Sequence, residues 1–341
     1  MKSLLKSGFL LSLSVFVACG SVENPTSVQP NDEPVRLKKI RLAAEEHRGG
    51  IEAFSEKMRQ RIAERKVVLA RRTADKILHG SKITVPDDFP TIQQAVDAAA
   101  PGTKIKVKAG TYNEYVIVTT DDIELTAEGE VIMRDAVFFD GVSGGSVNKF
   151  HFDNVQIGVL IASSDGVEVE DNSFEHCASV IALELATNCK VKGNTSFNAS
   201  RDVVLSVSSG NRIEDNHFVE GEFSIFLQLW SNDNEISGNT ILQADDVGII
   251  LLNNCENNEL KDNVVSDAEQ ATGILLYNTD HNEVGSDNKI NNNYRGIDVF
   301  NSSGNVIKKN EATGNSDCDI IQAGGVNTFI KNDADCISGF E

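Results

Sequence analysis

The stretch NEISGNTI, residues 234–241, decides the fold of this chain because its pattern recurs at a regular spacing. Similar stretches stand at 211–218 (NRIEDNHF) and 258–265 (NELKDNVV), each with an asparagine, an apolar residue and a second asparagine. The second asparagine recurs in steps of 22, 22, 23, 24, 25, 22 and 22 residues, at Asn172, Asn194, Asn216, Asn239, Asn263, Asn288, Asn310 and Asn332. A sustained period in this range predicts a solenoid of stacked coils.

Each repeat also contains a second apolar run, such as SIFLQL (224–229), GIILL (248–252) and GILLY (273–277). Coils of this length hold two or three short strands and have no room for a helix, which indicates a parallel β-helix. We expect the apolar residue of the motif to point into the core. The asparagines turn the chain, because asparagine tolerates left-handed backbone and bonds to nearby backbone, and their amides stack along the axis.

Helical signals precede the repeats. Thr91 and Gln94 form a capping box, and TIQQAVDAAA (91–100) follows, so we expect an N-terminal capping helix there. The segment 36–80 is basic, with 13 Lys and Arg against 6 Asp and Glu. Within it we predict an amphipathic helix over 51–79, because apolar residues recur at helical steps, namely Ile51, Phe54, Met58, Ile62, Leu69 and Ile77.

Residues 1–18 are typical of an export signal, with Lys2 and Lys6 ahead of the apolar run GFLLSLSVFVA (8–18). FVAC (16–19) resembles a bacterial lipoprotein lipobox, although Phe16 is bulkier than the usual residue. The resemblance implies cleavage before Cys19, lipidation of its thiol and a lipid anchor in the bacterial cell envelope, in the outer membrane of a Gram-negative cell. The body then faces the periplasm or the cell surface, and 19–35 is a flexible tether.

The charge limits the classes of ligand. The chain carries 31 Lys and Arg against 51 Asp and Glu, a net charge of −20, which argues against a nucleic-acid partner. Residues 81–341 alone carry 16 against 42. This body repels polyanions unless divalent cations bridge them, so a divalent cation is expected only with a polyanionic ligand. The charge therefore favours a neutral glycan or a protein partner.

Cysteines and histidines give little sign of a metal centre. His151, His176, His217 and His281 share no ligand spacing, and we expect no metal and no other cofactor. Cys318 and Cys336 are candidates for a disulfide near the C-terminus. The other three cysteines after Cys19 are interpreted as small buried residues, namely Cys177, Cys189 and Cys255.

The repeats, with TIQQAVDAA (91–99) and GTKIKVKAGTYNEYVIV (102–118), resemble the pectin lyase-like superfamily of right-handed parallel β-helices, and most of all its NosD-type, PbH1-repeat members. The resemblance covers 81–341 and implies an all-β solenoid, a right-handed parallel β-helix with an N-terminal capping helix and a preceding amphipathic helix. The superfamily contains polysaccharide lyases, hydrolases and epimerases as well as binding proteins, so this fold leaves the activity open.

Signatures of the catalytic families are incomplete in this chain. NTD (278–280) lacks the later motifs of polygalacturonase-like hydrolases, and TDHN (279–282) lacks the proline and second acid of uronate epimerases. The best catalytic candidates lie in adjacent coils and combine an acid, an imidazole and a cation, which lyase chemistry requires: Tyr277, Asp280, His281 and Arg295. The alternative is a turn cluster with a solvated arginine.

The second apolar run predicts an outward apolar face. Alternation along the strand sends every second residue outward. Two columns then run along the axis, and their apolar members are Phe226, Ile250, Leu252, Leu275, Tyr277 and Phe300, with polar neighbours Glu184, Gln228 and Asp298 and nearby Trp230. This face either stacks sugar rings or is covered by the 51–79 helix, which we favour because the helix is basic and apolar along one stripe.

These patterns favour an envelope lipoprotein whose noncatalytic β-helix binds polysaccharide or an envelope protein. The alternative is a carbohydrate-active enzyme, namely a polysaccharide lyase, hydrolase or epimerase, centred on the four catalytic candidates.

Overall fold

The computed structural model describes residues 35–69 and 82–339. The chain divides after His47 into two compact units, and α1 (Val35–Leu69) crosses that boundary. The expected signal peptide, the lipidation of Cys19 and the tether up to residue 34 lie outside the described residues. No helix among the described residues combines the length and apolarity that crossing a bilayer requires.

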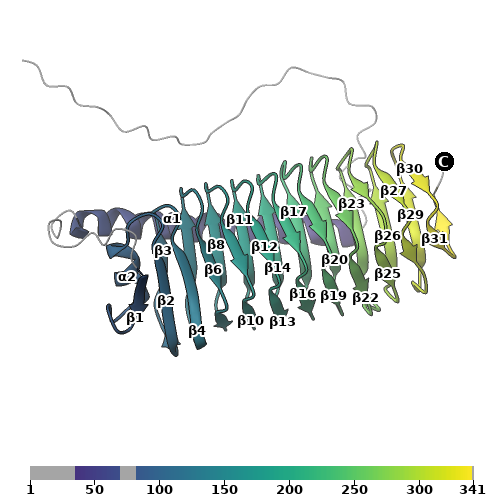
Figure 1. The fold of residues 1–341 in the computed structure, drawn as a ribbon. Coiled ribbons are helices and arrows are strands. Elements are labelled where there is room, and N and C mark those ends of the chain that lie inside the picture. Colours follow the sequence, from purple (N-terminus) through teal and green to yellow (C-terminus); the bar gives the residue numbers. More distant parts are fainter. Residues whose placement is uncertain (1–34, 70–81, 340–341) are drawn as a thin grey trace, which may run out of the picture. The chain divides into compact units, whose positions relative to one another are not determined.

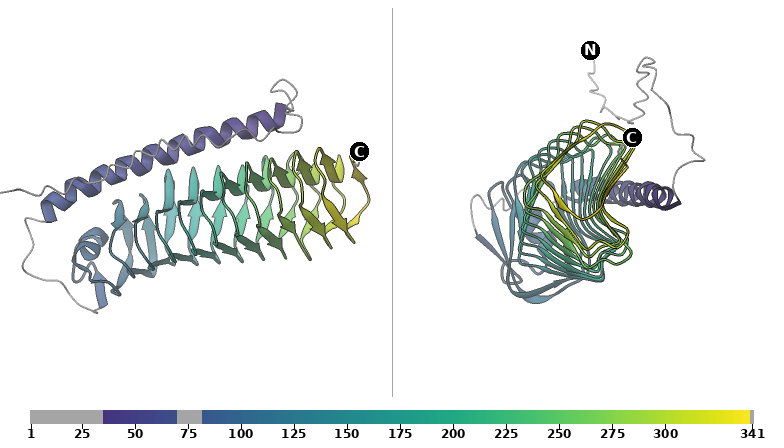
Figure 2. Two further views of the ribbon diagram at one scale, coloured as in Figure 1. Left: turned by 90° about the horizontal axis from the view of Figure 1, so that it is seen from above. Right: turned by 90° about the vertical axis from the view of Figure 1, so that its right-hand side faces the viewer.

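Residues 82–339 form a parallel β-solenoid, as the repeats predicted (Figure 1). From β6 onward the coils contribute strands to three separate ladders, and all pairings are parallel. The left view of Figure 2 shows the coils side by side in sequence order, and the right view shows them end on, one behind another. The chain therefore pairs each strand with its equivalent in the neighbouring coils.

The first ladder contains β1 (Lys82–Val85), β2 (Lys104–Tyr112), β4 (Glu124–Met133), β6 (Ser146–Asn148), β9 (Glu168–Glu170), β12 (Lys190–Lys192), β15 (Arg212–Glu214), β18 (Glu235–Ser237), β21 (Glu259–Lys261), β24 (Glu283–Val284), β27 (Val306–Lys308) and β30 (Thr328–Ile330). The second ladder pairs with the end of β4 and contains β7 (His151–Asp153), β10 (Ser173–Glu175), β13 (Thr195–Phe197), β16 (His217–Val219), β19 (Thr240–Leu242), β22 (Val264–Ser266), β25 (Lys289–Asn291), β28 (Glu311–Ala312) and β31 (Asp333–Ala334).

The third ladder is a separate sheet of longer strands. It contains β3 (Val116–Val118), β5 (Val137–Asp140), β8 (Ile157–Ala162), β11 (Ser179–Glu184), β14 (Arg201–Ser206), β17 (Phe223–Gln228), β20 (Val247–Leu252), β23 (Thr272–Tyr277), β26 (Arg295–Phe300), β29 (Cys318–Ala323) and β32 (Ile337–Ser338). Its inward column matches the sequence prediction and is buried in one continuous core: Ile181, Val203, Ile225, Ile249, Ile274, Ile297 and Ile320.

The asparagine ladder is confirmed. Each predicted asparagine from Asn172 to Asn310 donates its amide to the Oδ1 of the next, as Asn216 does to Asn239 at 2.9 Å. The same Nδ2 atom also reaches a core carbonyl of the preceding coil. A second ladder, which the sequence analysis did not single out, links Asn211, Asn234, Asn258, Asn282, Asn305 and Asn327.

The prediction that these asparagines themselves adopt left-handed backbone is wrong. The residue before each of them does so instead, for example Asp215 with φ 55° and Asp262 with φ 56°, while the amide of the asparagine bonds along the axis. Asparagine, aspartate and glycine adopt this conformation at little cost, so the short polar turns close each coil where the sequence places them.

The short helix expected over TIQQAVDAAA is α2 (Ile92–Ala98). The hydroxyl of Thr91 accepts the Gln94 N–H at 3.1 Å, as the capping box predicts. The carboxylate of Glu114 accepts two further N–H groups, from Ile92 and Gln93. These bonds satisfy the free donors at the helix N-terminus.

Candidate functional site

The four catalytic candidates do not converge. Tyr277 ends β23, and Asp280 and His281 lie in the turn that follows it, whereas Arg295 begins β26. The strand register pairs Arg295 with Thr272. Arg295 therefore lies at the far end of the strand from Tyr277, about 16 Å away at roughly 3.3 Å per residue. The coils are adjacent, as the sequence analysis assumed, but the positions along the strands are not.

Each candidate has a structural partner. The Oδ1 atom of Asp280 accepts the Ser303 N–H at 2.6 Å. The ring of His281 packs beside Gly304. A Cβ atom placed on Gly304 would lie 2.8 Å from Cδ2 of the His281 ring, so the ring fits only beside a glycine. The Tyr277 ring is nearly buried and stacks on Phe300 at 5.4 Å. These contacts support the turn-cluster alternative.

Arg295 is held by two carboxylates. Its Nε donates to Asp317 at 2.7 Å, and its Nη1 donates to Asp298 at 2.8 Å. Burial lowers the pKa of Arg295, but hydrogen bonds to Asp317 and Asp298 more than offset this and the net pKa is raised. A guanidinium whose donors are already shared in this way is poorly placed to neutralise the carboxylate of a sugar acid.

The outward columns of the third ladder have the predicted register. Phe226 pairs with Ile250 and then Leu275, and Gln228 pairs with Leu252 and then Tyr277. Most members of the predicted face are buried, namely Phe226, Gln228, Ile250, Leu252, Leu275 and Asp298, and Phe300 is intermediate. Trp230 differs from them because it lies in the following turn, with 57% of its surface exposed.

Part of α1 packs on the third ladder. Ile51, Phe54 and Met58 of the predicted stripe are buried in one cluster with outward residues of the early strands, namely Ile117, Ala136, Phe138, Ile157, Leu160, Ala162 and Ala182. The Ser55 hydroxyl donates to Glu184 Oε2 at 2.8 Å. The prediction of a packing surface is confirmed for Ile51, Phe54 and Met58, whereas the side chains of Ile62, Leu69 and Ile77 lie outside the described part of the chain.

The position of this stripe differs from the sequence prediction. Arg59 approaches Asp140 at 3.9 Å, and the guanidinium of Arg61 lies 4.5 Å from the ring centre of Tyr115. Residues 51–61 therefore contact the coils of 115–184, not those of 226–300. The helix also begins at Val35 rather than 51. From Ser55 to Arg61 the helix contacts progressively earlier residues, namely Glu184, Asp140 and Tyr115, so this part of it packs on the first coils of the solenoid.

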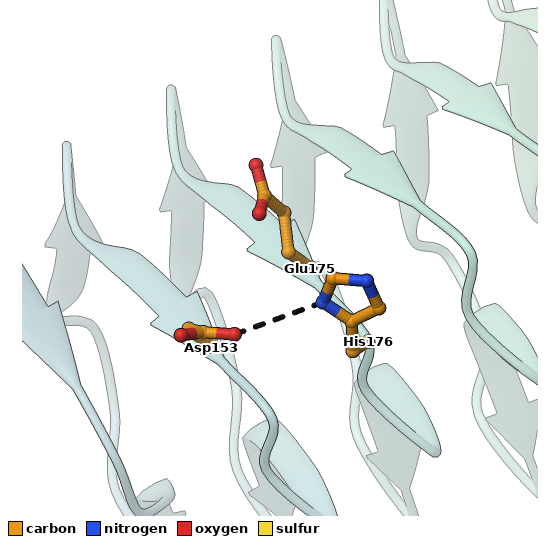
Figure 3. Close-up of side chains that lie close together, drawn as sticks. All are labelled: Asp153, Glu175 and His176. Atoms are coloured by element: carbon orange, nitrogen blue, oxygen red, sulfur yellow. Dashed lines mark ion pairs between the residues drawn. The ribbon is translucent and has the colours of Figure 1, made fainter.

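One group of side chains has the composition of a metal site. Asp153, Glu175 and His176 come from adjacent coils, and their potential ligand atoms lie within 4.8 Å of one another (Figure 3). Asp153 Oδ1 is 3.8 Å from His176 Nδ1, while the Arg134 guanidinium binds the other carboxylate oxygen of Asp153. The cation of Arg134 thus competes directly with a metal ion.

These residues do not fit a copper centre. They provide one imidazole, and one of the two carboxylates is paired with Arg134. The described sulfur ligands are inaccessible: Met58 and Met133 are buried, and burial raises the pKa of Cys177 and Cys189 to about 11 and that of Cys255 to about 12. Copper sites require several imidazole or sulfur ligands, which the described residues do not bring together.

The structure reveals a feature that the sequence analysis missed. Leu185, Val207 and Leu229 occupy the same turn position in three consecutive coils, each with a left-handed backbone, at φ 53°, 52° and 54°. Trp230 follows with φ 60°. We call these four residues the apolar ridge. Later coils have Asn253, Asn278 and Asn301 at this position, so the sequence signal was the replacement of a polar turn residue by an apolar one.

The comparisons with known proteins agree with this fold. The model of the NosD family, described as periplasmic copper-binding protein, matches residues 96–267 and 229–335. No curated protein matches the sequence.

Three solved structures have a similar fold, and the titles of the first two name enzymes that act on polysaccharides. The A-module of the Azotobacter vinelandii mannuronan C-5 epimerase AlgE6 is 17% identical, with 69% of this chain and 74% of that chain covered and a TM-score of 0.57. The catalytic unit of the Streptomyces thermodiastaticus GH87 α-1,3-glucanase is 14% identical, covering 79% and 71%, with a TM-score of 0.52. The DFA-IIIase of Arthrobacter chlorophenolicus is 12% identical, covering 74% and 94%, with a TM-score of 0.50.

At these identities the solved structures establish the shared fold alone. The family model matches residues 96–335 in two overlapping segments, which is more than half of the chain and most of the solenoid, from α2 to the last coils. The chain therefore belongs to the NosD family.

Proposed function

We propose that the protein is a noncatalytic polysaccharide-binding solenoid of the bacterial cell envelope. One observation carries this proposal: the residues with acid, base and cation chemistry that were candidates for catalysis are separated and engaged in structural contacts. Arg295 is bound by two aspartates at one end of its strand, while Asp280 and His281 lie in a turn at the other. Acid–base catalysis requires such groups within hydrogen-bond reach of one reacting centre.

Two further observations support a glycan as the ligand. Proteins of similar fold act on carbohydrates, so the solenoid is suited to long sugar chains. The body is strongly acidic, which favours a neutral polysaccharide over a polyanion. A divalent cation would be required only if the ligand were anionic.

The test measures binding and turnover on the same preparation. The mature protein is run by affinity electrophoresis through gels with a neutral β-1,3-glucan, a β-1,4-glucan, a galactomannan or alginate. Released reducing ends and unsaturated uronates are assayed in parallel. We expect retardation by at least one neutral polysaccharide and no product. Retardation by none of them would refute the proposal.

The competing candidate is an enzyme of the carbohydrate-active type, centred on Tyr277, Asp280, His281 and Arg295. It would release product from one of these polysaccharides, and His281→Ala would abolish the release. If product still formed after one of these four residues had been replaced, the catalytic residues would lie elsewhere in the chain. Any turnover by the unaltered protein overturns the noncatalytic assignment.

The envelope location rests on the N-terminal sequence and on the periplasmic description of the family. We propose that Cys19 is lipidated after cleavage of residues 1–18. Cells labelled with a clickable palmitate analogue should yield a labelled, membrane-bound protein, and Cys19→Ala should abolish both the label and the membrane association. A variant that stays in the membrane fraction without label would rule out the lipid anchor.

A further inference from the structure

The apolar ridge is an exposed row of side chains on three stacked coils. Leu185, Val207 and Trp230 expose 43%, 41% and 57% of their surfaces. Backbone bonds hold the turns in register, because the Leu185 N–H donates to the Ser206 carbonyl and the Val207 N–H to that of Gln228. The ridge therefore runs along the direction in which the coils stack.

The ridge is built at a conformational cost. L-residues other than asparagine and aspartate avoid positive φ, and a β-branched residue such as Val207 is a marked outlier there. The next coils solve the same turn with Asn253, Asn278 and Asn301. An exposed apolar residue with left-handed backbone stabilises the fold neither by burying its side chain nor by favouring the turn. Its presence therefore favours a role in contact with a ligand.

Polar amides adjoin the ridge in the coils that follow it. Trp230 and Asn254 are the second residues of two-residue turns in neighbouring coils, and both are exposed. Beyond them, amides bond along the axis, from Asn278 to Asn253 at 3.3 Å and from Asn301 to Asn278 at 2.5 Å. An indole beside amides matches a sugar ring, which has an apolar face and a rim of hydroxyl groups.

We propose that the apolar ridge, extended by Asn254, binds one chain of a neutral polysaccharide that lies along the stacking direction. This inference rests on the proposed function and assigns its binding site and ligand class. The charge of residues 81–341, with 16 Lys and Arg against 42 Asp and Glu, disfavours acidic glycans and anionic lipid surfaces at this ridge.

The chain offers a direct probe because Trp230 is its only tryptophan. Its fluorescence is titrated with the neutral polysaccharides of the gel assay, using the mature protein. We expect the emission to shift to shorter wavelength and the binding curve to match that from electrophoresis. Trp230→Ala should weaken binding at least tenfold. Phe197→Ala, which removes an aromatic residue 42% exposed at the end of β13, is the matched control and should stay within twofold.

A second variant separates binding from folding. Val207→Asn gives the turn the residue used by later coils, so its unfolding midpoint should be equal or higher while its affinity falls at least threefold. If polysaccharide binds without changing the Trp230 emission, and both ridge variants keep the affinity of the unaltered protein, the ridge is not the binding site and the proposed function stands. If no polysaccharide binds, both fail. A shift with phosphatidylcholine vesicles alone would make the ridge a membrane contact and refute this inference.

Discussion

At the scale of single residues, each asparagine of the two ladders combines several bonds. Asn239 Oδ1 accepts both the backbone N–H of Asn216 and its side-chain amide. The Asn239 amide in turn donates to the Ile213 carbonyl and to Asn263. Buried polar groups are tolerated only when they are paired, and here the pairing is provided by the equivalent residue of the next coil.

Removing one member leaves buried groups unsatisfied. Asn239→Ala removes the partner of three buried groups, namely the two donors of Asn216 and the Ile213 carbonyl. The loss should cost at least about 3 kcal/mol at roughly 1–3 kcal/mol per group. Asn332→Ala, at the partly buried end of the same ladder, should cost less than half of that. Urea unfolding of the two variants measures the difference. Equal losses would contradict the role of stacking.

The core also contains an acidic residue. Asp202 is fully buried, and burial raises its pKa to about 7, partly offset by the hydrogen bond from Ser196. The folded pKa lies above the ordinary value of 3.8, so the folded protein binds the proton more tightly than the unfolded chain. Its contribution to stability is therefore greatest at low pH, falls between about pH 4 and pH 7, and stays low above that.

Asp202→Asn removes this titration with little change of shape. We expect the variant to be more stable than the unaltered protein at pH 8, by up to about 4 kcal/mol at 1.36 kcal/mol per pKa unit, and close to it at pH 4. Thermal unfolding across pH 4–8 measures the difference. A gap that does not grow with pH would contradict a protonated Asp202. Ser224→Ala is a suitable control, because it leaves the carboxyl group in place.

At the scale of elements, α1 depends on its contact with the third ladder. An amphipathic helix gains most of its stability from packing, and residues 49–50 are two glycines, which weaken it in isolation. The buried side chains of Ile51, Phe54 and Met58, with the Ser55–Glu184 bond, supply this packing. The solenoid does not need the helix for its own strand pairing.

Met58→Asp tests this dependence. Met58 is fully buried, and an unpaired carboxylate there costs several kcal/mol, enough to detach residues 51–61. Hydrogen exchange should show loss of protection in α1 while the strands of the solenoid stay protected. Ala53→Asp, on the exposed side of the same helix, should leave protection unchanged. Loss of protection throughout the solenoid would show that the two elements fold as one.

At the scale of the whole molecule, each coil contacts chiefly its neighbours, so stability is a sum of coil and interface terms and the ends are the weakest part. The C-terminal end is closed by a disulfide between Cys318 and Cys336, as the sequence suggested, with Cα atoms 5.2 Å apart and a sequence separation of 18. Asp319 accepts the N–H groups of Asp335 and Cys336 and holds the same segment.

The disulfide should act locally. Cys318→Ser with Cys336→Ser should destabilise the last coil by about 3 kcal/mol, the value for a loop of this length, and expose β29 to β32 to limited proteolysis. Coils before β26 should keep their protection in hydrogen exchange. Uniform loss of protection would mean that unfolding is cooperative over the full solenoid. The double substitution avoids a single unpaired thiol.

The coil period, the inward and outward columns, the asparagine ladder and the helix stripe could all be read from the sequence, because each follows from local spacing repeated many times. Alternation at two residues determines which side chains enter the core, and a period of 22 to 25 residues determines which ones stack. These rules predicted the strand register from Val203 to Ile320 correctly.

Only the tertiary structure decided where residues of neighbouring coils meet. Arg295 and His281 belong to adjacent coils, yet they lie at opposite ends of the paired strands β23 and β26. Arg295 pairs with the first residue of β23, whereas His281 lies in the turn after its last residue. The direction of α1 over the early coils and the left-handed turns of Leu185 and Val207 depend likewise on contacts between distant segments. Sequence spacing determines the coil, whereas packing between coils determines which side chains form a site.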